Sequence, residues 1–314
     1  MIVTVTLNPS LDRTIEVGGV VRGALVRGTS TRVDAGGKGV NVARALTANG
    51  VPARAVLPLG GPDGERLLDL LTSAGLDVVA VPVRSATRSN VSLVEPDGTT
   101  TKVNEPGGRL DRDDVEALVA SVLAAATGAD WAVLCGSLPP GVPHDVYARL
   151  CRALQAAGTS VAVDSSGPAL TAALDVRPAL VKPNREELAE TAGRPLLTLG
   201  DVLTAAEELR ARGAGSVLAS LGADGALLVE RAGVLRGRST VLAPRSSVGA
   251  GDAMLAGFLS AGAAGAPALA TALAWGAAAA GLPGSRMPTT SDLRPDDVTT
   301  SPLLDRTTPL STSH

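Results

Sequence analysis

Histidine, cysteine and aromatic residues are scarce in this sequence. Among its 314 residues there are 2 histidines and 2 cysteines, and Phe, Trp and Tyr together make up 1%. The histidines are His144 and His314, so a Ser-His-Asp triad or a histidine-rich metal site is almost excluded. Any chemistry must therefore use carboxylates, lysine, arginine, asparagine and backbone amides.

The sequence also lacks the usual marks of nucleic-acid and membrane proteins. Its 28 Lys and Arg against 31 Asp and Glu give a net charge of −3, and the few aromatics offer no surface for base stacking. No apolar run approaches the about 20 residues that span a bilayer, and the first residues lack the features of a signal peptide. Cys135 lies in a strand-like run and Cys151 in a helix-like one, as expected of reduced core thiols. We expect a cytoplasmic protein that binds neither nucleic acid nor membrane.

Strand-like and helix-like segments alternate through most of the chain, and 45% of the residues are hydrophobic. This alternation predicts an α/β sandwich with a mostly parallel sheet, in a single domain over residues 1–300. The tail over 301–314 is rich in Thr, Ser and Pro and is expected to be poorly ordered. The predicted strands are 2–7, 53–59, 131–136, 160–164, 179–182 and 216–220. The predicted helices between them are 41–49, 64–73, 113–126, 145–157, 185–191 and 202–212.

Two regions break this pattern and predict a small β lid. Residues from about 13–33 and 87–105 alternate in the manner of antiparallel strands, and the second region has a turn at Pro96-Asp97-Gly98. In α/β proteins the ligand lies beyond the carboxyl ends of the strands. A lid there would close over the ligand and exclude water, which protects a group transfer from hydrolysis.

The stretch Ser247 to Phe258 places Gly249 and Gly251 just before an apolar helical run, with Asp252 beside them. The start of such a helix presents unpaired N–H groups, and the glycines allow an anion to approach closely. The helix dipole favours the charge of Asp252 in the first turn. The alternative is that Asp252 is an ordinary helix cap.

The run Asp34 to Asn41 opens another helix with Gly36-Gly37-Lys38-Gly39. It is not a Walker A loop, because glycine follows the lysine, and the chain has no Rossmann glycine pattern. A glycine-lined helix start beside Lys38 and Asn41 suits an anionic or hydroxyl-rich ligand. A solvated loop lysine is the alternative.

Polar residues near the predicted lid could contact a sugar phosphate. Asp12 follows the first strand, where it could accept hydrogen bonds from sugar hydroxyls, or it is an ordinary turn aspartate after Asn8-Pro9. Arg88 stands beside Asn90 and could grip a phosphate with two hydrogen bonds. Alternatively, Arg88 is solvated at a strand edge.

Two further motifs follow strands in the second half of the chain. In Lys182-Pro183-Asn184, Asn184 lies three residues before Glu187, which fits a capping box or a water-mediated Mg²⁺ site. The run Ser220 to Ala226 is a tight glycine turn between two strands, and it could leave room for a nucleotide.

Together these motifs resemble the PfkB (ribokinase-like) carbohydrate kinase family over nearly the whole chain. The match is closest to the branch of 1-phosphofructokinases and tagatose-6-phosphate kinases. The motifs that carry it are Ser247 to Gly257, Gly36 to Asn41, Thr6-Leu7-Asn8-Pro9 with Asp12, Thr87 to Asn90, Gly136 to Gly141, Lys182-Pro183-Asn184 with Glu187, and Ser220-Leu221-Gly222.

The resemblance implies a three-layer α/β/α sandwich with a small antiparallel β lid, and it implies roles for the matching residues. Asp252 would be the catalytic base, with an anion hole made by Gly249, Ala250 and Gly251. The sugar phosphate would be held by Asp12, Gly36, Gly37, Lys38, Asn41, Arg88, Asn90 and Ser137. The ATP site would be lined by Lys182, Asn184, Ser220, Gly222, Gly225 and Ser247. Mg²⁺ would be bound, through water, by Asn184 and Glu187.

The implied activity is ATP-dependent phosphorylation of the free primary hydroxyl of a ketohexose monophosphate. Fructose 1-phosphate, converted to fructose 1,6-bisphosphate, is the expected acceptor, and tagatose 6-phosphate and fructose 6-phosphate are alternatives. A non-catalytic sugar-phosphate or nucleotide sensor is a more distant alternative. The intact Gly-x-Gly-Asp argues against a sensor, because a binder without turnover can lose its base. The family resemblance also implies a homodimer formed through the lid.

Overall fold

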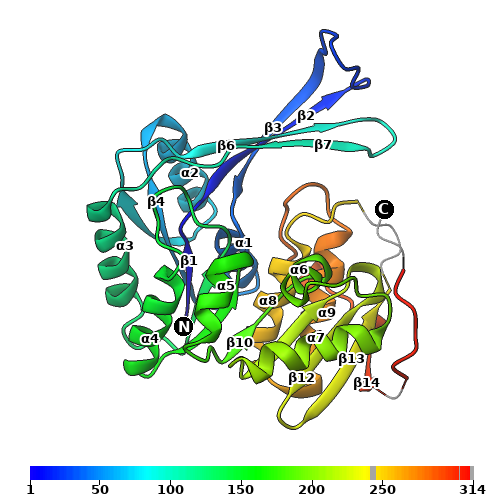
Figure 1. Cartoon of the computed structure of the whole chain (residues 1–314). Helices are drawn as coiled ribbons and strands as arrows, with labels where there is room; N and C mark the ends of the chain where they lie inside the picture. Colours follow the sequence, from blue (N-terminus) through cyan, green and yellow to red (C-terminus); the bar gives the residue numbers. More distant parts are fainter. Residues whose placement is uncertain (241–244, 304, 312–314) are drawn as a thin grey trace.

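The chain folds around one large sheet with helices on both faces and a smaller sheet at one side (Figure 1). The computed structural model describes residues 1–240, 245–303 and 305–311. The large sheet has ten strands, and the six pairings from β11 across to β5 are all parallel. The strands from β11 to β14 pair antiparallel. In spatial order the strands are β14 (Val298–Pro302), β13 (Gly233–Ser239), β12 (Ala226–Glu230), β11 (Ser216–Ser220), β10 (Leu180–Val181), β9 (Ser160–Asp164), β8 (Trp131–Cys135), β1 (Ile2–Thr6), β4 (Ala53–Leu59) and β5 (Asp77–Pro82).

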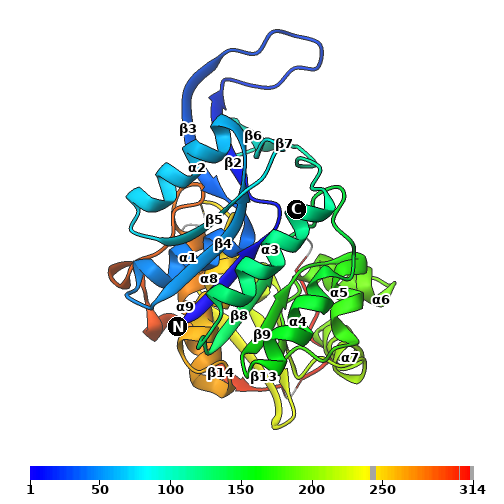
Figure 2. The same cartoon turned by 90° about the vertical axis from the view of Figure 1, so that its left-hand side faces the viewer.

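Helices form one layer on each face of this sheet, and Figure 2 shows α3, α4 and α5 in front with α1, α8 and α9 behind. Because the strands are covered on both faces, their residues are apolar without interruption, as in Ala132 to Cys135, which are fully buried. The first layer consists of α3 (Arg112–Ala125), α4 (Val146–Ala156), α5 (Gly167–Leu174), α6 (Arg185–Ala192) and α7 (Leu199–Ala211). The second contains α1 (Lys38–Ala48), α8 (Ala250–Ser260) and α9 (Gly265–Ala280), and α2 (Gly61–Ser73) packs with α1 next to the lid. This is the three-layer sandwich expected from the sequence.

The smaller sheet is the predicted lid, and it projects beyond the carboxyl ends of the parallel strands (Figure 1). Its strands lie in the order β3-β2-β6-β7, with bounds β2 (Ser10–Val17), β3 (Gly28–Gly36), β6 (Arg88–Val94) and β7 (Thr100–Asn104). The two hairpins β2–β3 and β6–β7 are antiparallel, whereas β2 and β6 pair parallel. The first lid strand begins at Ser10, earlier than the expected position 13, so Asp12 lies within β2 and not in a turn.

The C-terminal region differs from the expected poorly ordered tail over 301–314. Ser301 and Pro302 belong to β14, and Leu310 is buried against the core. An isolated bridge joins Pro309 to Thr198. Residues 304 and 312–314 lie outside the described residues. Composition alone was misleading here, because a few well-placed contacts can hold a polar segment against the body of the protein.

Two further observations concern the cysteines and the hydropathy of the helices. Cys135 and Cys151 are both buried free thiols. Within the part of the chain that the structure describes, no helix has the length and apolar character needed to cross a membrane.

Candidate active site

The predicted site residues gather where parallel strands end beneath the lid. Thr6 pairs with Cys135 and Cys135 with Asp164, so β1, β8 and β9 end side by side. Lys182 follows β10 directly, and its amide donates to the carbonyl of Val163 at 3.0 Å. The N-termini of α1 and α8 point at the same place. The large sheet thus delivers acidic and basic side chains from sequence-distant segments to one site.

Asp252 lies in the first turn of α8, buried and 7% exposed. It does not cap the helix, because the N-cap residue is Gly249 and there is no side-chain cap bond. Its Oδ2 accepts a hydrogen bond from Nδ2 of Asn41 at 2.8 Å. Burial, and then the charge of Asp164, raise the pKa of Asp252 to about 6, and the Lys182 charge opposes this. A carboxylate with this pKa is ionised at neutral pH and is still basic enough to take a proton.

The backbone at the start of α8 depends on Gly249. Its φ is +77°, a left-handed conformation that side chains disfavour. A Cβ at this position would also lie 2.5 Å from Cε of Met287. This turn places the amide of Gly251 at the helix start, where an anion can approach it, while the amide of Ala250 makes only a long hydrogen bond, 3.4 Å, to the carbonyl of Ser247. Nζ of Lys182 lies 3.5 Å from where a Cβ on Gly251 would stand, so a cation adjoins these amides.

A network of buried ion pairs occupies the centre of the site. Asp164 is completely buried, and its two oxygens face Lys38 at 2.7 Å and Lys182 at 2.9 Å. Lys38 also contacts Oε1 of Glu187 at 2.7 Å. Burial works against ionisation of Asp164, but the two ammonium groups together hold its pKa below the usual range. Burial similarly opposes the charge on Lys38, and the two carboxylates raise its pKa overall.

Asp164 was missed in the sequence reasoning, although a signal for it exists. It is the last residue of a correctly predicted strand, and the rule that drew attention to Asp12 applies equally to it. The placement of Lys38 also differs from the sequence expectation. Its ammonium lies with Asp164 and Glu187, and it shares no hydrogen-bond partner with Arg88 in the described part of the chain.

Asn184 and Glu187 form the capping box that the sequence left as one of two possibilities. Oδ1 of Asn184 accepts from the amide of Glu187 at 2.8 Å, and Oε2 of Glu187 accepts from the amide of Asn184 at 2.9 Å. The remaining oxygen of Glu187 faces Lys38. The described residues include no cluster of three or more His, Cys, Asp or Glu that could hold a metal. A metal bound by this pair would have to complete its coordination with water or substrate oxygens.

Polar groups of the lid form a second cluster around Asp12. Oδ1 of Asp12 accepts hydrogen bonds from Oγ of Ser10 at 2.7 Å and from Nδ2 of Asn90 at 2.9 Å. Gly36 lies so close that a Cβ there would be 2.3 Å from the second carboxylate oxygen. Oδ1 of Asn90 is buried and has no partner within the described chain. The cluster thus presents unused acceptors of the kind that bind sugar hydroxyls.

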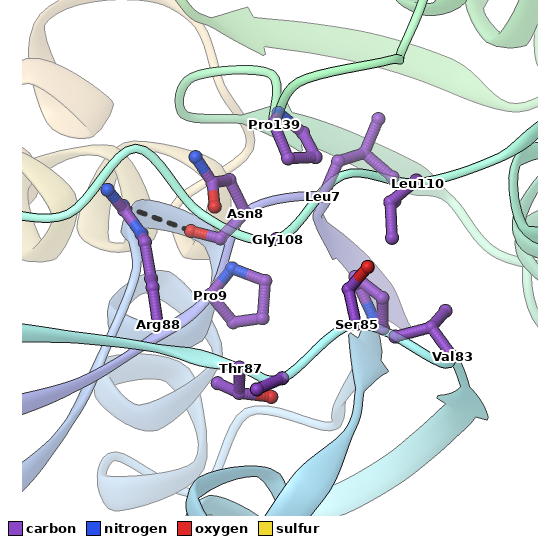
Figure 3. A pocket seen from close by; sticks show the side chains of 12 residues that line it. Leu7, Asn8, Pro9, Val83, Ser85, Thr87, Arg88, Gly108, Leu110 and Pro139 are labelled. Atoms are coloured by element: carbon purple, nitrogen blue, oxygen red, sulfur yellow. Dashed lines mark hydrogen bonds between the residues drawn. The ribbon is translucent and has the colours of Figure 1, made fainter.

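Arg88 lines a small, open pocket that Asp252 does not line (Figure 3). Its guanidinium donates to the carbonyls of Glu105 at 2.8 Å and Asn8 at 3.1 Å, while its Nε is buried without a partner in the described chain. Burial lowers the pKa of Arg88, against the opposing charges of Asp12 and Glu105. Ser137 reaches the same region, since its Oγ accepts from Nδ2 of Asn8 at 3.3 Å. The pocket is lined by Leu7, Asn8, Pro9, Pro58, Val83, Ser85, Ala86, Thr87, Arg88, Gly108, Leu110 and Pro139.

The residues assigned to a nucleotide lie on the other side of the ion-pair network. Ser220 and Asn184 form an isolated parallel bridge, and the amide of Ser220 donates to the carbonyl of Pro183 at 3.0 Å. The turn continues as a short 3₁₀ helix over Gly222–Asp224 and closes at Gly225. Ser247 is exposed next to the start of α8. The structure therefore brings the lid cluster, the Asp252 helix and this turn around one centre.

Comparison with known proteins identifies the family of the chain. Residues 5–294 match the model of the family described as pfkB family carbohydrate kinase. A 1-phosphofructokinase of Rhodobacter capsulatus is 41% identical over 262 residues, which cover 82% of each chain. A 1-phosphofructokinase of Haloferax volcanii is 40% identical and covers 93% of this chain and 95% of its own. The crystal structure of phosphofructokinase-2 from Escherichia coli in complex with substrates and products superposes with a TM-score of 0.87 at 34% identity, over 93% and 96% of the two chains.

Proposed function

Because the chain belongs to the pfkB family of carbohydrate kinases, we propose that it uses ATP to phosphorylate the free primary hydroxyl of fructose 1-phosphate, giving fructose 1,6-bisphosphate. The names of the relatives at 40–41% identity support this acceptor. The observation that carries the proposal is the buried carboxylate of Asp252, held by Asn41 at the glycine-rich start of α8. A base next to an anion-binding helix start is what phosphoryl transfer to an alcohol requires.

In the proposed step the acceptor oxygen attacks the γ-phosphorus of ATP. The new O–P bond forms as the bond from the γ-phosphorus to the β,γ-bridging oxygen breaks, and ADP leaves. The hydroxyl proton passes to the carboxylate of Asp252, a contribution typically worth about 10²- to 10⁴-fold in rate. With a pKa of about 6, Asp252 is ready to accept this proton at neutral pH.

Charge on the moving phosphoryl group is stabilised by the start of α8 and by Lys182. The amides of Gly249, Ala250 and Gly251 form the anion hole, and the ammonium of Lys182 lies next to Gly251. These groups are held in place before ATP binds, because Lys182 is only 4% exposed and is paired with Asp164. The nucleotide then extends over Asn184, Ser220, Gly222 and Gly225, with Ser247 at the edge.

On the acceptor side, Asp12 and Asn90 bind the sugar hydroxyls, with Gly36 and Gly37 allowing the ring to come close and Ser137 at the edge. Arg88 binds the phosphate already on the sugar, and its unpaired Nε supports this role. Lys38 would have to leave two carboxylates to reach that phosphate, so we assign it to the reacting centre, between Asp164 and Glu187. This assignment differs from the sugar-phosphate role that the family resemblance implied for Lys38.

A divalent metal fits this site only as a hydrated ion brought in with ATP. Mg²⁺ commonly keeps several waters and binds one or two carboxylates together with substrate phosphates. Glu187 supplies one such carboxylate beside Lys38, whereas both oxygens of the buried Asp164 face ammonium groups and Asn184 is occupied by the capping box. When bound, Mg²⁺ would neutralise charge on the phosphates.

The exposed face of the lid supports a homodimer. Four apolar lid residues are unusually open to solvent, namely Val20, Val21, Leu25 and Val103, at 37%, 65%, 76% and 58% exposure. Val20, Val21 and Leu25 are close in sequence, in the segment between β2 and β3, and an exposed apolar patch there would be typical of a protein interface. Sedimentation of the purified protein tests this, and a monomer at micromolar concentration would contradict it. The expected cytoplasmic location remains a prediction.

A coupled assay of ADP release tests the proposed activity. The acceptors are fructose 1-phosphate, fructose 6-phosphate, tagatose 6-phosphate, fructose and ribose, each with ATP and Mg²⁺. We expect the highest kcat/KM with fructose 1-phosphate. A higher value with tagatose 6-phosphate or fructose 6-phosphate would transfer the assignment to that sugar. Binding of a sugar phosphate without ADP release from any acceptor would favour the sensor.

A further inference from the structure

The segment 305–311, which we call the C-terminal strap, crosses the start of α7 after β14. The amide of Gly200 donates to the carbonyl of Arg306 at 2.8 Å, and that of Leu199 donates to the carbonyl of Thr308 at 3.0 Å. The amide of Leu310 donates in turn to the carbonyl of Leu197 at 2.8 Å, and the Leu310 side chain is buried in the core. The strap is therefore a fixed part of the fold between Arg306 and Leu310.

At its end the strap joins two separate elements through Ser311. The amide and the hydroxyl of Ser311 donate to the two carboxylate oxygens of Asp224, at 2.8 and 2.9 Å. The carbonyl of Ser311 accepts from Nη1 of Arg185 at 2.6 Å. Asp224 is buried, so its carboxylate has little contact with water, and these two donors replace the hydrogen bonds that water would make. The strap thus supplies polar partners that the rest of the described chain does not provide to Asp224.

Both elements belong to the proposed nucleotide site. Asp224 ends the 3₁₀ turn that begins at Gly222, and Arg185 is the first residue of α6, directly after Asn184. On the side of the sheet the two elements are linked by the bridge between Asn184 and Ser220. Ser311 provides a second link between them, on the side of the strap.

We propose that the C-terminal strap positions the ATP-binding turn against the start of α6, with Ser311, Asp224 and Arg185 as positioning residues. This inference rests on the proposed kinase function. The strap makes no hydrogen bond to the lid cluster around Asp12 in the described chain, so its effect should be confined to the nucleotide. Loosening the strap should weaken ATP binding and leave binding of the sugar phosphate nearly unchanged.

Three changes loosen the strap at different points. Asp224→Asn keeps the shape of the side chain but turns an acceptor of Ser311 into a donor. Ser311→Ala removes only the hydroxyl, and Ser311→Thr restores one. Gly200→Val acts from α7, because even a Cβ at this position would lie 2.9 Å from the carbonyl oxygen of Arg306. Glu207→Gln, at an exposed position of the same helix, is the matched control.

The measurements are the ATP dissociation constant by calorimetry, without sugar, and KM for both substrates. We expect Asp224→Asn and Gly200→Val to raise the dissociation constant and KM for ATP about three- to tenfold. Ser311→Ala should have a smaller effect in the same direction, and Ser311→Thr should reverse it. KM for fructose 1-phosphate should stay within about twofold, and Glu207→Gln should match the wild type.

The outcomes separate this inference from the proposed function. Unchanged ATP affinity in folded Asp224→Asn and Ser311→Ala proteins would overturn the inference and leave the kinase assignment intact. Equal losses for ATP and for sugar phosphate would also overturn it, because they indicate general destabilisation. If the wild-type protein binds ATP but phosphorylates no acceptor, only the proposed function fails. If it does not bind ATP, both fail.

Discussion

Nδ2 of Asn41 donates to Oδ2 of Asp252 at 2.8 Å across 211 residues of sequence. The bond joins the start of α1 to the start of α8, so the two glycine-rich motifs form one unit. Asn41 is itself oriented by Arg44, whose Nη1 lies 3.3 Å from the carboxamide oxygen of Asn41. This orientation presents the amide donor to Asp252 and stabilises its charged form.

Asp252→Asn should lower kcat at least about a hundredfold, because the amide cannot accept the hydroxyl proton. The Asn side chain keeps an oxygen toward Asn41, so the fold should be retained. Steady-state kinetics with ATP and fructose 1-phosphate measure the loss, and circular dichroism checks the fold. Turnover near that of the wild type would remove Asp252 from the role of base.

The rate should depend on pH through Asp252. Its raised pKa of about 6 means that the carboxyl becomes protonated, and the base is lost, as the pH falls through that value. We expect kcat/KM to fall about tenfold per pH unit below pH 6 and to level off above it. The charged groups that set this pKa are Asp164, Lys182 and Lys38, all within the site. Asn41→Leu removes a hydrogen bond to the charged form and should move the acid limb to higher pH. If kcat/KM begins to fall at the same pH in this variant as in the wild type, Asn41 does not affect the pKa of the base.

The same raised pKa predicts how stability changes with pH. The folded-state pKa of Asp252 lies above its unfolded value, so between about pH 4 and pH 6 the folded protein binds more protons and loses stability as pH rises. Above pH 6 the buried charge destabilises the fold in full. We therefore expect Asp252→Asn to melt at a higher temperature than the wild type at pH 8, with the difference shrinking toward pH 4. Thermal melts of both proteins at the two pH values give the answer, and a difference independent of pH would assign the stabilisation to another cause.

The large sheet could be predicted from the sequence because its strands are short, continuously apolar and bounded by turn residues. The predicted strands Ala53–Leu59, Ser160–Asp164 and Ser216–Ser220 agree with β4, β9 and β11 residue for residue. The lid was accessible for the opposite reason, since its half-exposed strands alternate. Both patterns are formed by residues close together in the sequence, so they can be recognised without knowing the tertiary structure.

The contacts between side chains in the site were much harder to predict from the sequence. The spacing of Asn184 and Glu187 allowed a capping box, but nothing in it indicated that Glu187 would also hold Lys38. The direction of the Lys38 side chain depends on Asp164, which lies 126 residues away and on another strand. Such pairs are created by the order of strands in the sheet, and the local patterns of a single sequence do not reveal that order. The role of the C-terminal strap could not be predicted for the same reason, because the importance of Ser311 follows only from its contacts with Asp224 and Arg185.

Arg88→Ala should raise KM for the phosphorylated sugar at least about tenfold and change KM for ATP little. The expected size follows from the loss of charged hydrogen bonds to a phosphate. Arg88 also holds the carbonyls of Asn8 and Glu105, so its removal could act by loosening the pocket. Unphosphorylated fructose separates these effects, because its KM should be insensitive to a lost phosphate contact but sensitive to a disturbed pocket.

Arg13→Ala is the matched control for this prediction. Arg13 lies on β2 opposite Val91 of β6, the strand that begins at Arg88, but its side chain pairs with Asp63 at 3.2 Å and does not line the pocket. Its removal should leave KM for both substrates within about twofold. An equal rise in KM for ATP and for sugar phosphate in Arg88→Ala would mean that Arg88 does not bind the substrate phosphate. The cation for that phosphate would then have to come from another residue, and Lys38, released from Asp164 and Glu187 when substrates bind, would be the first to test.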